Sequence, residues 1–212
     1  MDVGGQSGAR RGPSKWAVLA LVFFPLILAD QWTKFLAVER LTYLFQRFGI
    51  RETARQWAAF YQIKHLEGLA REPYVVLRPL WRMSYAENTG SAFGLFRSLP
   101  DGFRVGFFLV VSLVAVAYIL WYYRRLQRDQ RWLQLSLAFV LTGALGNFVD
   151  RATRGYVVDF IQWHWWNRPD LYWPTFNLAD ALIVVGVAML IVHPGERRAR
   201  RAEAGPASPA AT

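Results

Sequence analysis

The apolar residues of this chain gather in long blocks, and they do not recur at the short intervals that mark an amphipathic helix or a half-buried strand. Residues 105–123 and 132–149 contain no charged side chain over 19 and 18 positions. A helix needs about 20 apolar residues to cross about 30 Å of hydrocarbon at a rise of about 1.5 Å per residue. Both blocks therefore predict membrane-spanning helices.

Two shorter apolar blocks flank this pair in the chain. Residues 16–29 give 14 uncharged positions before Asp30, and residues 181–192 give 12 after Asp180. Each block becomes long enough to span the membrane if its neighbouring acid lies inside the membrane boundary. The first block also imitates a secretory signal peptide, but Ile27 stands where a cleavage site requires a small residue. We therefore predict four membrane-spanning helices, the first of them retained.

The net charge of +10 raises the question of a nucleic-acid partner, but the basic residues are distributed by topology. Three clusters lie before the first block, between the second and third, and after the fourth, and they comprise Arg10, Arg11 and Lys15; Arg124, Arg125, Arg128 and Arg131; and Arg197, Arg198, Arg200 and Arg201. With four spans these clusters share one side, which the positive-inside rule assigns to the cytoplasm. We therefore expect cytoplasmic termini, segments 39–102 and 150–175 outside, and no nucleic-acid partner.

The outer segments show weaker patterns. Residues 52–69 mix aromatic and charged side chains, which is typical either of an amphipathic helix on the outer membrane surface or of a solvated, partly ordered insertion. Residues 74–85 resemble a strand that Pro79 would confine to a sheet edge. A third pattern predicts an aromatic belt at the headgroup level, made of Trp163, Trp165, Trp166, Tyr172 and Trp173.

Two acids stand alone in apolar sequence. Asp159 lies between Val158 and Phe160, and Asp180 leads directly into the last apolar block. An ionisable residue near hydrocarbon is costly, so it is a functional hypothesis by default. Two close carboxylates that share one proton can activate a water and protonate a leaving group, which is the chemistry of an aspartic protease.

Metal and thiol chemistry find no support in the sequence. The chain contains no cysteine. His65, His164 and His193 lack the spacing and the partner acids that would build a metal site. We therefore expect neither a metal nor a cofactor, and we interpret the three histidines as structural or interfacial.

Two other classes of membrane protein remain open at this point. A proton- or ion-coupled carrier would also place Asp30, Asp159 and Asp180 near a membrane, but close to its midplane and usually in repeated halves. We see no internal repeat in the sequence. A structural scaffold would not need these acids together with Asn147 and Asn177. Depth distinguishes the classes, because a protease of this kind needs its acids at the outer interface.

Several polar residues also have structural interpretations. Asp30 and Lys34 are spaced for an ion pair at a helix end. Asn88 begins an Asn-Thr-Gly sequence that is typical of a turn. Asn177 can cap the last helix, and this role is compatible with a role in the site.

Four ordered blocks resemble lipoprotein signal peptidase (signal peptidase II), a family of membrane aspartic endopeptidases. The blocks are residues 30–34 (DQWTK), 88–94 (NTGSAFG), 143–160 (GALGNFVDR continuing to VVDF) and 176–180 (FNLAD). The similarity extends over roughly residues 16–192. It implies four transmembrane helices and an extracytoplasmic β platform, in an otherwise all-α membrane fold.

The resemblance also implies roles for individual residues. It places the catalytic pair at Asp159 and Asp180. The substrate-binding residues that it implies are Asn88, Asn147, Arg151 and Asn177. The supporting residues that it implies are Asp30, Lys34, Gly90, Phe93, Gly143, Gly146, Asp150 and Ala179. For Asp150, a contact that satisfies the helix end is a competing interpretation.

We therefore expect one integral membrane protease domain over residues 1–212, with disordered cytoplasmic tails at 1–14 and 197–212. By resemblance, it lies in the bacterial cytoplasmic (inner) membrane with its active site at the outer face. It would remove the signal peptide from diacylglyceryl-modified prolipoproteins by cleaving before the lipidated Cys. Its partners would be this substrate and membrane lipids, and we expect a monomer. The connection 39–82 is longer than is usual in the family.

Overall fold

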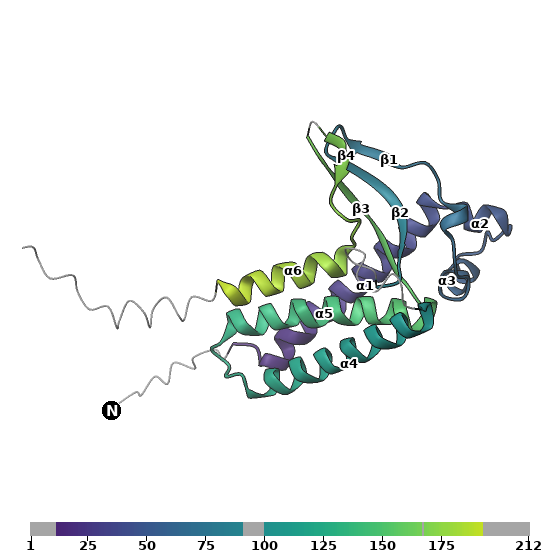
Figure 1. Cartoon of the computed structure of the whole chain (residues 1–212). Coiled ribbons are helices and arrows are strands. Elements are labelled where there is room, and N and C mark those ends of the chain that lie inside the picture. The colour runs from purple at the N-terminus through teal and green to yellow at the C-terminus, as the bar shows by residue number, and fades with distance from the viewer. Residues whose placement is uncertain (1–11, 91–99, 167, 193–212) are drawn as a thin grey trace, which may run out of the picture.

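The computed structural model describes residues 12–90, 100–166 and 168–192. Four helices lie side by side along one direction, and a small sheet and two short helices gather at one end of them (Figure 1). The four are α1 (Lys15–Leu41), α4 (Asp101–Arg125), α5 (Arg131–Arg154) and α6 (Leu178–Ile191). Helix α5 contacts each of the other three, so it is the centre of the bundle. The expected tail 197–212 and most of the tail 1–14 lie outside the described residues.

Three of these helices are long and apolar enough to cross a membrane, namely Lys15–Leu41, Gly102–Arg125 and Arg131–Arg154. Helix α6 is apolar but has 14 residues. The structure therefore confirms a mainly helical protein with three candidate spans, and the fourth span stays a prediction.

Hydrogen bonds between helices show which ends of the bundle lie together. The Nζ atom of Lys15 donates to the carbonyl oxygens of Arg124, at 2.6 Å, and Leu126, at 2.9 Å. The indole of Trp132 donates to the carbonyl oxygen of Met189, at 2.6 Å. The start of α1, the α4–α5 connection and the end of α6 therefore share one end, and the sheet lies at the other (Figure 1).

The sheet is antiparallel in the order β1-β2-β3-β4. Its strands are β1 (Tyr74–Leu77), β2 (Trp81–Asn88), β3 (Val157–Trp165) and β4 (Arg168–Tyr172). The single edge strand expected over residues 74–85 is wrong, because the chain forms two strands around Pro79. Proline has no N–H to donate to a ladder, so it ends β1 at the turn, and β2 becomes an internal strand.

The connection between α1 and β1 is folded. It contains α2 (Leu44–Arg47), α3 (Thr53–Gln62) and the 3-10 turn Glu67–Leu69. Of the two interpretations for residues 52–69, the structure favours the helical one, although the helix covers only 53–62. Its buried residues, Ala59 and Phe60, belong to one core cluster with residues of α1 and the sheet.

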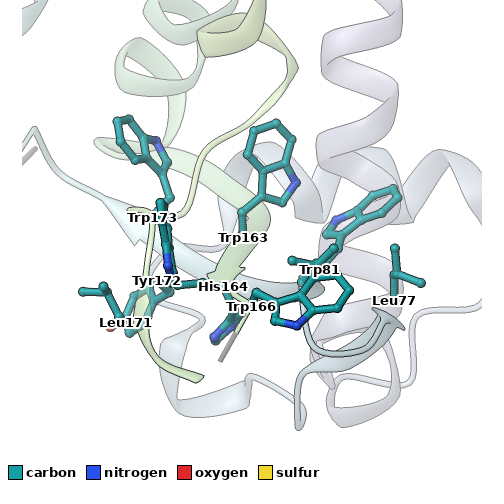
Figure 2. A pocket seen from close by; sticks show the side chains of 10 residues that line it. Leu77, Trp81, Trp163, His164, Trp166, Leu171, Tyr172 and Trp173 are labelled. Atoms are coloured by element: carbon teal, nitrogen blue, oxygen red, sulfur yellow. The ribbon is translucent and has the colours of Figure 1, made fainter. Parts of the chain in front are cut away.

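The predicted aromatic belt lies on strands β3 and β4 and the residues that follow each of them. Its rings line an open, apolar pocket of about 900 Å³ together with Leu77, Leu80 and Trp81. Figure 2 shows the rings of Trp81, Trp163 and Trp173 projecting toward the same side. Exposed tryptophan of this kind is typical of a membrane–water interface.

Candidate active site

The predicted catalytic acids come from two different elements at the sheet end of the bundle. Asp159 is the third residue of β3, and Asp180 lies in the first turn of α6. Asp159 is 2 % exposed, whereas Asp180 is partly exposed. A strand and a helix N-terminus thus bring the two carboxylates into one site.

Asn177 connects the two acids. Its Nδ2 atom donates to Oδ1 of Asp159 at 2.6 Å, and its Oδ1 atom accepts from the backbone N–H of Asp180 at 3.0 Å. The Asn177 N–H donates in return to Oδ2 of Asp180 at 3.2 Å, which completes a capping box. Asn177 therefore caps α6 and holds Asp159 at the same time.

Two more amides complete the polar contacts of the acids. Asn88 ends β2 and donates from Nδ2 to Oδ2 of Asp159 at 3.0 Å. Asn147, on α5, donates from Nδ2 to Oδ1 of Asp180 at 2.7 Å. Because Oδ1 of Asn147 accepts from Lys34 at 3.1 Å, the orientation of its amide is fixed. The structure thus brings all three predicted asparagines to the two acids.

The environment of Asp159 favours its protonated form. Burial and the neighbouring charge of Asp180 raise the pKa of Asp159 to about 8, against the lowering effect of the Asn88 and Asn177 hydrogen bonds. A carboxyl of this kind holds a proton at neutral pH. A proton donor and an ionisable partner therefore lie in one site.

Behind the acids lies a buried ionic cluster that we call the clamp, composed of Asp30, Lys34 and Asp150. The Nζ atom of Lys34 lies 2.9 Å from Oδ2 of Asp30 and 3.0 Å from Oδ2 of Asp150, and all three side chains are fully buried. Arg154 forms a further ion pair with Asp150. Two carboxylates thus face two cations, which compensates the cost of burying each charge.

Each carboxylate of the clamp also holds the backbone beside a candidate catalytic acid. Oδ1 of Asp30 accepts from the N–H of Ala179 at 3.0 Å, one residue before Asp180. Oδ2 of Asp150 accepts from the N–H of Val158 at 3.2 Å, one residue before Asp159. The clamp therefore ties together the two chain segments that carry the acids.

Small residues let the elements approach this closely. A Cβ atom on Gly146 would stand 2.6 Å from Oδ2 of Asp30, and one on Gly143 would overlap the carbonyl oxygen of Ala179. Gly90 has φ +102°, and a Cβ atom there would overlap the ring of Phe108. Each of these glycines therefore lies in close contact with another element, and their supporting role stays a prediction.

Arg151 has the least satisfied side chain near the acids. Its guanidinium lies 5.2 Å from the ring of Phe108, and its Nε atom has no hydrogen-bond partner among the described residues. The charges of Asp180 and Asp159 act on it. Phe93, the remaining predicted support, lies outside the described residues.

Sequence reasoning missed three polar residues of this region, Gln31, Arg154 and Glu87. Gln31 lies within the first family block and bonds to Asp30 and Asp150. Arg154 stands four residues after Asp150, a spacing that signals an ion pair on a helix. Glu87 precedes Asn88 and gave no signal of its own.

Two of the three histidines lie beside polar side chains, and His193 lies outside the described residues. The ring of His164 lies 3.0 Å from Oε1 of Gln162, and Nδ1 of His65 lies 3.8 Å from Glu87. The part of the chain that the structure describes contains no group of three His, Cys, Asp or Glu side chains able to hold a metal.

Comparison with known proteins places these features in a family. A family model described as signal peptidase (SPase) II matches residues 22–194. The chain is 60 % identical over 191 residues to a lipoprotein signal peptidase of an Anaeromyxobacter species, covering 90 % of both chains. It is 33 % identical to that of Thermodesulfovibrio yellowstonii, covering 81 % of this chain and 90 % of the relative.

A solved structure described as a bacterial membrane enzyme superposes with a TM-score of 0.61 at 19 % identity, covering 87 % of this chain and 91 % of the other. This similarity supports the fold. Together with the family model and the close relatives, it leads to one conclusion: the chain belongs to the signal peptidase II family.

Proposed function

We propose that this protein is a membrane aspartic endopeptidase that removes the signal peptide from prolipoproteins, with Asp159 and Asp180 as its catalytic pair. Membership of the signal peptidase II family gives the class of enzyme. The assignment of these two residues rests on one observation, which is that the side chain of Asn177 forms hydrogen bonds to both of them. Asp30 and Asp150, the other buried acids of this region, are fully buried and pair with Lys34.

The reaction uses the two acids in different protonation states. Asp180 accepts a proton from a water, whose oxygen attacks the scissile carbonyl carbon while Asp159 donates its proton to the carbonyl oxygen. The tetrahedral intermediate then collapses as Asp180 passes its proton to the leaving nitrogen and Asp159 recovers one from the intermediate. The raised pKa of Asp159 supports its assignment as the initial proton donor.

The amides and Arg151 have separate tasks in this proposal. Asn88, Asn147 and Asn177 hold the carboxylates, since each donates to one of them. Further binding of substrate by these amides remains part of the family expectation. Arg151 contacts the substrate backbone, because its buried Nε atom has no hydrogen-bond partner in the part of the chain that the structure describes. A bound peptide carbonyl would satisfy that donor.

The arrangement also supports an orientation in the membrane. The described basic residues of two clusters, Lys15 and Arg124 to Arg131 among them, lie at the end of the bundle opposite to the acids. We therefore propose four spans with α6 as the last, both termini in the cytoplasm, and the site at the outer face of the inner membrane.

The position of the acids favours a protease over a carrier. Asp180 is in the first turn of α6, and Asp159 is on the sheet, so both lie at an end of the bundle. A carrier would hold its acids near the middle of the helices. The substrate that we propose is a precursor with a diacylglyceryl-modified Cys after the scissile bond, and the enzyme acts as a monomer among membrane lipids.

A cleavage assay on a lipid-modified precursor tests the assignment. We expect Asp159→Asn to reduce turnover at least about 10³-fold, because it removes half of an acid–base pair. Asp129→Asn, in the connection between α4 and α5 at the far end of the bundle, is the matched control and should retain full turnover. Near-normal cleavage by Asp159→Asn would show that the acid pair is wrongly assigned.

A further inference from the structure

The segment between α1 and β1 forms a closed unit, which we call the brace and define as residues 42–70. Its two ends meet in a β-bridge between Thr42 and Ala70. The N–H of Tyr43 donates to the carbonyl oxygen of Leu69 at 2.8 Å, and that of Arg71 to Leu41 at 2.8 Å. The first and last residues of the brace therefore lie next to each other at the C-terminal end of α1 (Figure 1).

The brace is packed as a fixed part of the protein. Leu44 and Phe60 are fully buried, in one core cluster with Val38 of α1. Trp57 stacks on Phe35 with ring centroids 4.2 Å apart and an interplanar angle of 13°. Burying large apolar side chains stabilises by about 1.5–3 kcal/mol each, so opening the brace like a lid would be costly.

A hydrogen-bonded chain runs from the brace to the clamp. The hydroxyl of Tyr61 donates to Oε1 of Gln31 at 3.1 Å. Nε2 of Gln31 then donates to Oδ2 of Asp30 at 3.0 Å and to Oδ1 of Asp150 at 3.0 Å. Because carboxylates only accept hydrogen bonds, Asp30 and Asp150 direct Nε2 of Gln31 toward the clamp. The Tyr61 hydroxyl holds the other end of the amide, Oε1, and so restricts where Nε2 lies.

Burial raises the pKa of the Tyr61 hydroxyl above its usual value. The hydroxyl therefore stays a proton donor across the neutral range. The hydrogen bond from Tyr61 to Gln31 therefore persists at the pH at which Asp159 and Asp180 act.

Two further contacts join the brace to the same region. Arg154 is 1 % exposed, pairs with Asp150, and lies 4.0 Å from the centre of the Phe60 ring. Its Nη1 atom donates to the carbonyl oxygen of Phe60 at 3.3 Å. Glu87, which precedes Asn88, accepts from the N–H of Leu66 in the brace. The brace thus reaches both the clamp and the strand that carries Asn88.

We propose that the brace is a positioning element of the active site, and that Tyr61 and Gln31 are positioning residues that act through the clamp. This inference rests on the assignment of Asp159 and Asp180 as the catalytic pair. Gln31 orients the carboxylates of Asp30 and Asp150, and these hold the backbone N–H groups that precede Asp180 and Asp159. Loosening the amide of Gln31 therefore displaces the acids relative to each other.

Tyr61→Phe is the sharpest test, because it removes the hydroxyl and keeps the ring that packs on Phe60 at 4.8 Å. We expect kcat on a lipid-modified precursor to fall about three- to tenfold with KM unchanged, since small misplacements of reacting groups slow the chemical step. Tyr123→Phe is the matched control. It removes a comparable 2.7 Å bond, to the carbonyl oxygen of Lys15 at the far end of the bundle, and should leave kcat unchanged.

A double-mutant cycle separates positioning from a general loss of stability. In a Gln31→Met background, Tyr61→Phe should have no further effect on kcat, because the hydrogen bond that the hydroxyl makes to Gln31 is already removed. Effects of the two changes that multiply, or an unchanged kcat in Tyr61→Phe whatever its unfolding temperature, would overturn the proposal. Either result leaves the catalytic pair intact, because that assignment is tested by the loss of turnover in Asp159→Asn.

Discussion

The side chain of Asn177 shows how one residue can serve structure and chemistry together. Its Nδ2 atom donates to Asp159 at 2.6 Å and to Oδ1 of Asn147 at 3.2 Å, while its Oδ1 atom accepts from the Asp180 N–H. Because both its Nδ2 and its Oδ1 atom form hydrogen bonds, this buried amide can adopt only one orientation. The sequence left a capping role and a role in the site both open for Asn177, and the geometry satisfies both.

At the same scale, the raised pKa of Asp159 predicts the pH dependence of turnover. Asp159 must be protonated to donate, and its pKa is about 8. Turnover should therefore fall above about pH 8, by up to about tenfold per pH unit. Because the two acids act together as proton donor and acceptor, the profile as a whole should be bell-shaped. Initial rates on a fixed lipid-modified precursor between pH 4 and 10 measure this, and a flat profile above pH 8 would contradict the assignment.

The raised pKa of Asp159 also predicts that Asp159→Asn changes how the stability of the protein depends on pH. The pKa of Asp159 is higher in the folded protein than the ordinary value of 3.8 for an aspartate. Its contribution to stability is therefore fully present below about pH 4 and is lost as pH rises toward about 8. In Asp159→Asn this loss should disappear, so the unfolding temperature of the variant should fall less than that of the wild type between pH 5 and 8. Parallel curves for the two proteins would contradict the shift.

At the scale of elements, the contact between α5 and α6 depends on the absence of side chains. A Cβ atom on Gly143 would overlap the backbone oxygen of Ala179, and one on Gly186 would stand 2.7 Å from the carbonyl oxygen of Ser136. Since Ala179 adjoins Asp180, the spacing of these two helices also sets the position of a candidate catalytic acid.

Gly143→Ala should therefore destabilise the protein by about 1–3 kcal/mol, as overpacking does, and should reduce turnover as well. Gly106→Ala on α4 is the matched control, because nothing lies within 4 Å of the Cβ atom that it would add. That change should leave stability equal or raise it by about 0.5–1 kcal/mol, since alanine is the better helix former. Thermal unfolding in detergent measures both, and equal effects at the two positions would contradict the packing argument.

The elements also show where sequence reasoning stops. The uncharged block 16–29 ended at Asp30, yet α1 continues to Leu41, because Asp30 and Lys34 neutralise each other in the buried interior. Local pattern located the apolar helices and the acids, since these depend on composition and spacing. Tyr61 bonds to Gln31, which lies 30 residues away, and no local pattern reveals that contact. The four-residue spacing of Asp150 and Arg154 is, by contrast, a local signal of their ion pair.

At the scale of the whole molecule, the two ends of the bundle differ in chemistry. One end holds Lys15, Trp132 and the basic α4–α5 connection. The sheet lies at the other end (Figure 1), together with the acids and the tryptophan-lined pocket. Apolar helices between a basic end and an aromatic end are typical of a protein that crosses a bilayer in one orientation. The site then lies at one membrane surface, where a lipid-anchored peptide would meet it.

This placement predicts that the lipid of the substrate contributes to its selection. Asp159, on β3, and Asp180, at the start of α6, lie at one end of the bundle, so they would reach a scissile bond only at the membrane surface, where a diacylglyceryl anchor would hold the precursor. Anchoring raises the local concentration of the peptide and restricts its orientation, so side-chain contacts need to supply less of the binding free energy. A precursor with an unmodified Cys, or with Ser in its place, should therefore be cleaved at least about 10²-fold more slowly in proteoliposomes. The matched control is the lipid-modified precursor presented to the Asp159→Asn variant, which should give no product. Equal rates for modified and unmodified precursors would mean that the site acts on membrane peptides in general, because geometry at the surface would then be sufficient without the anchor.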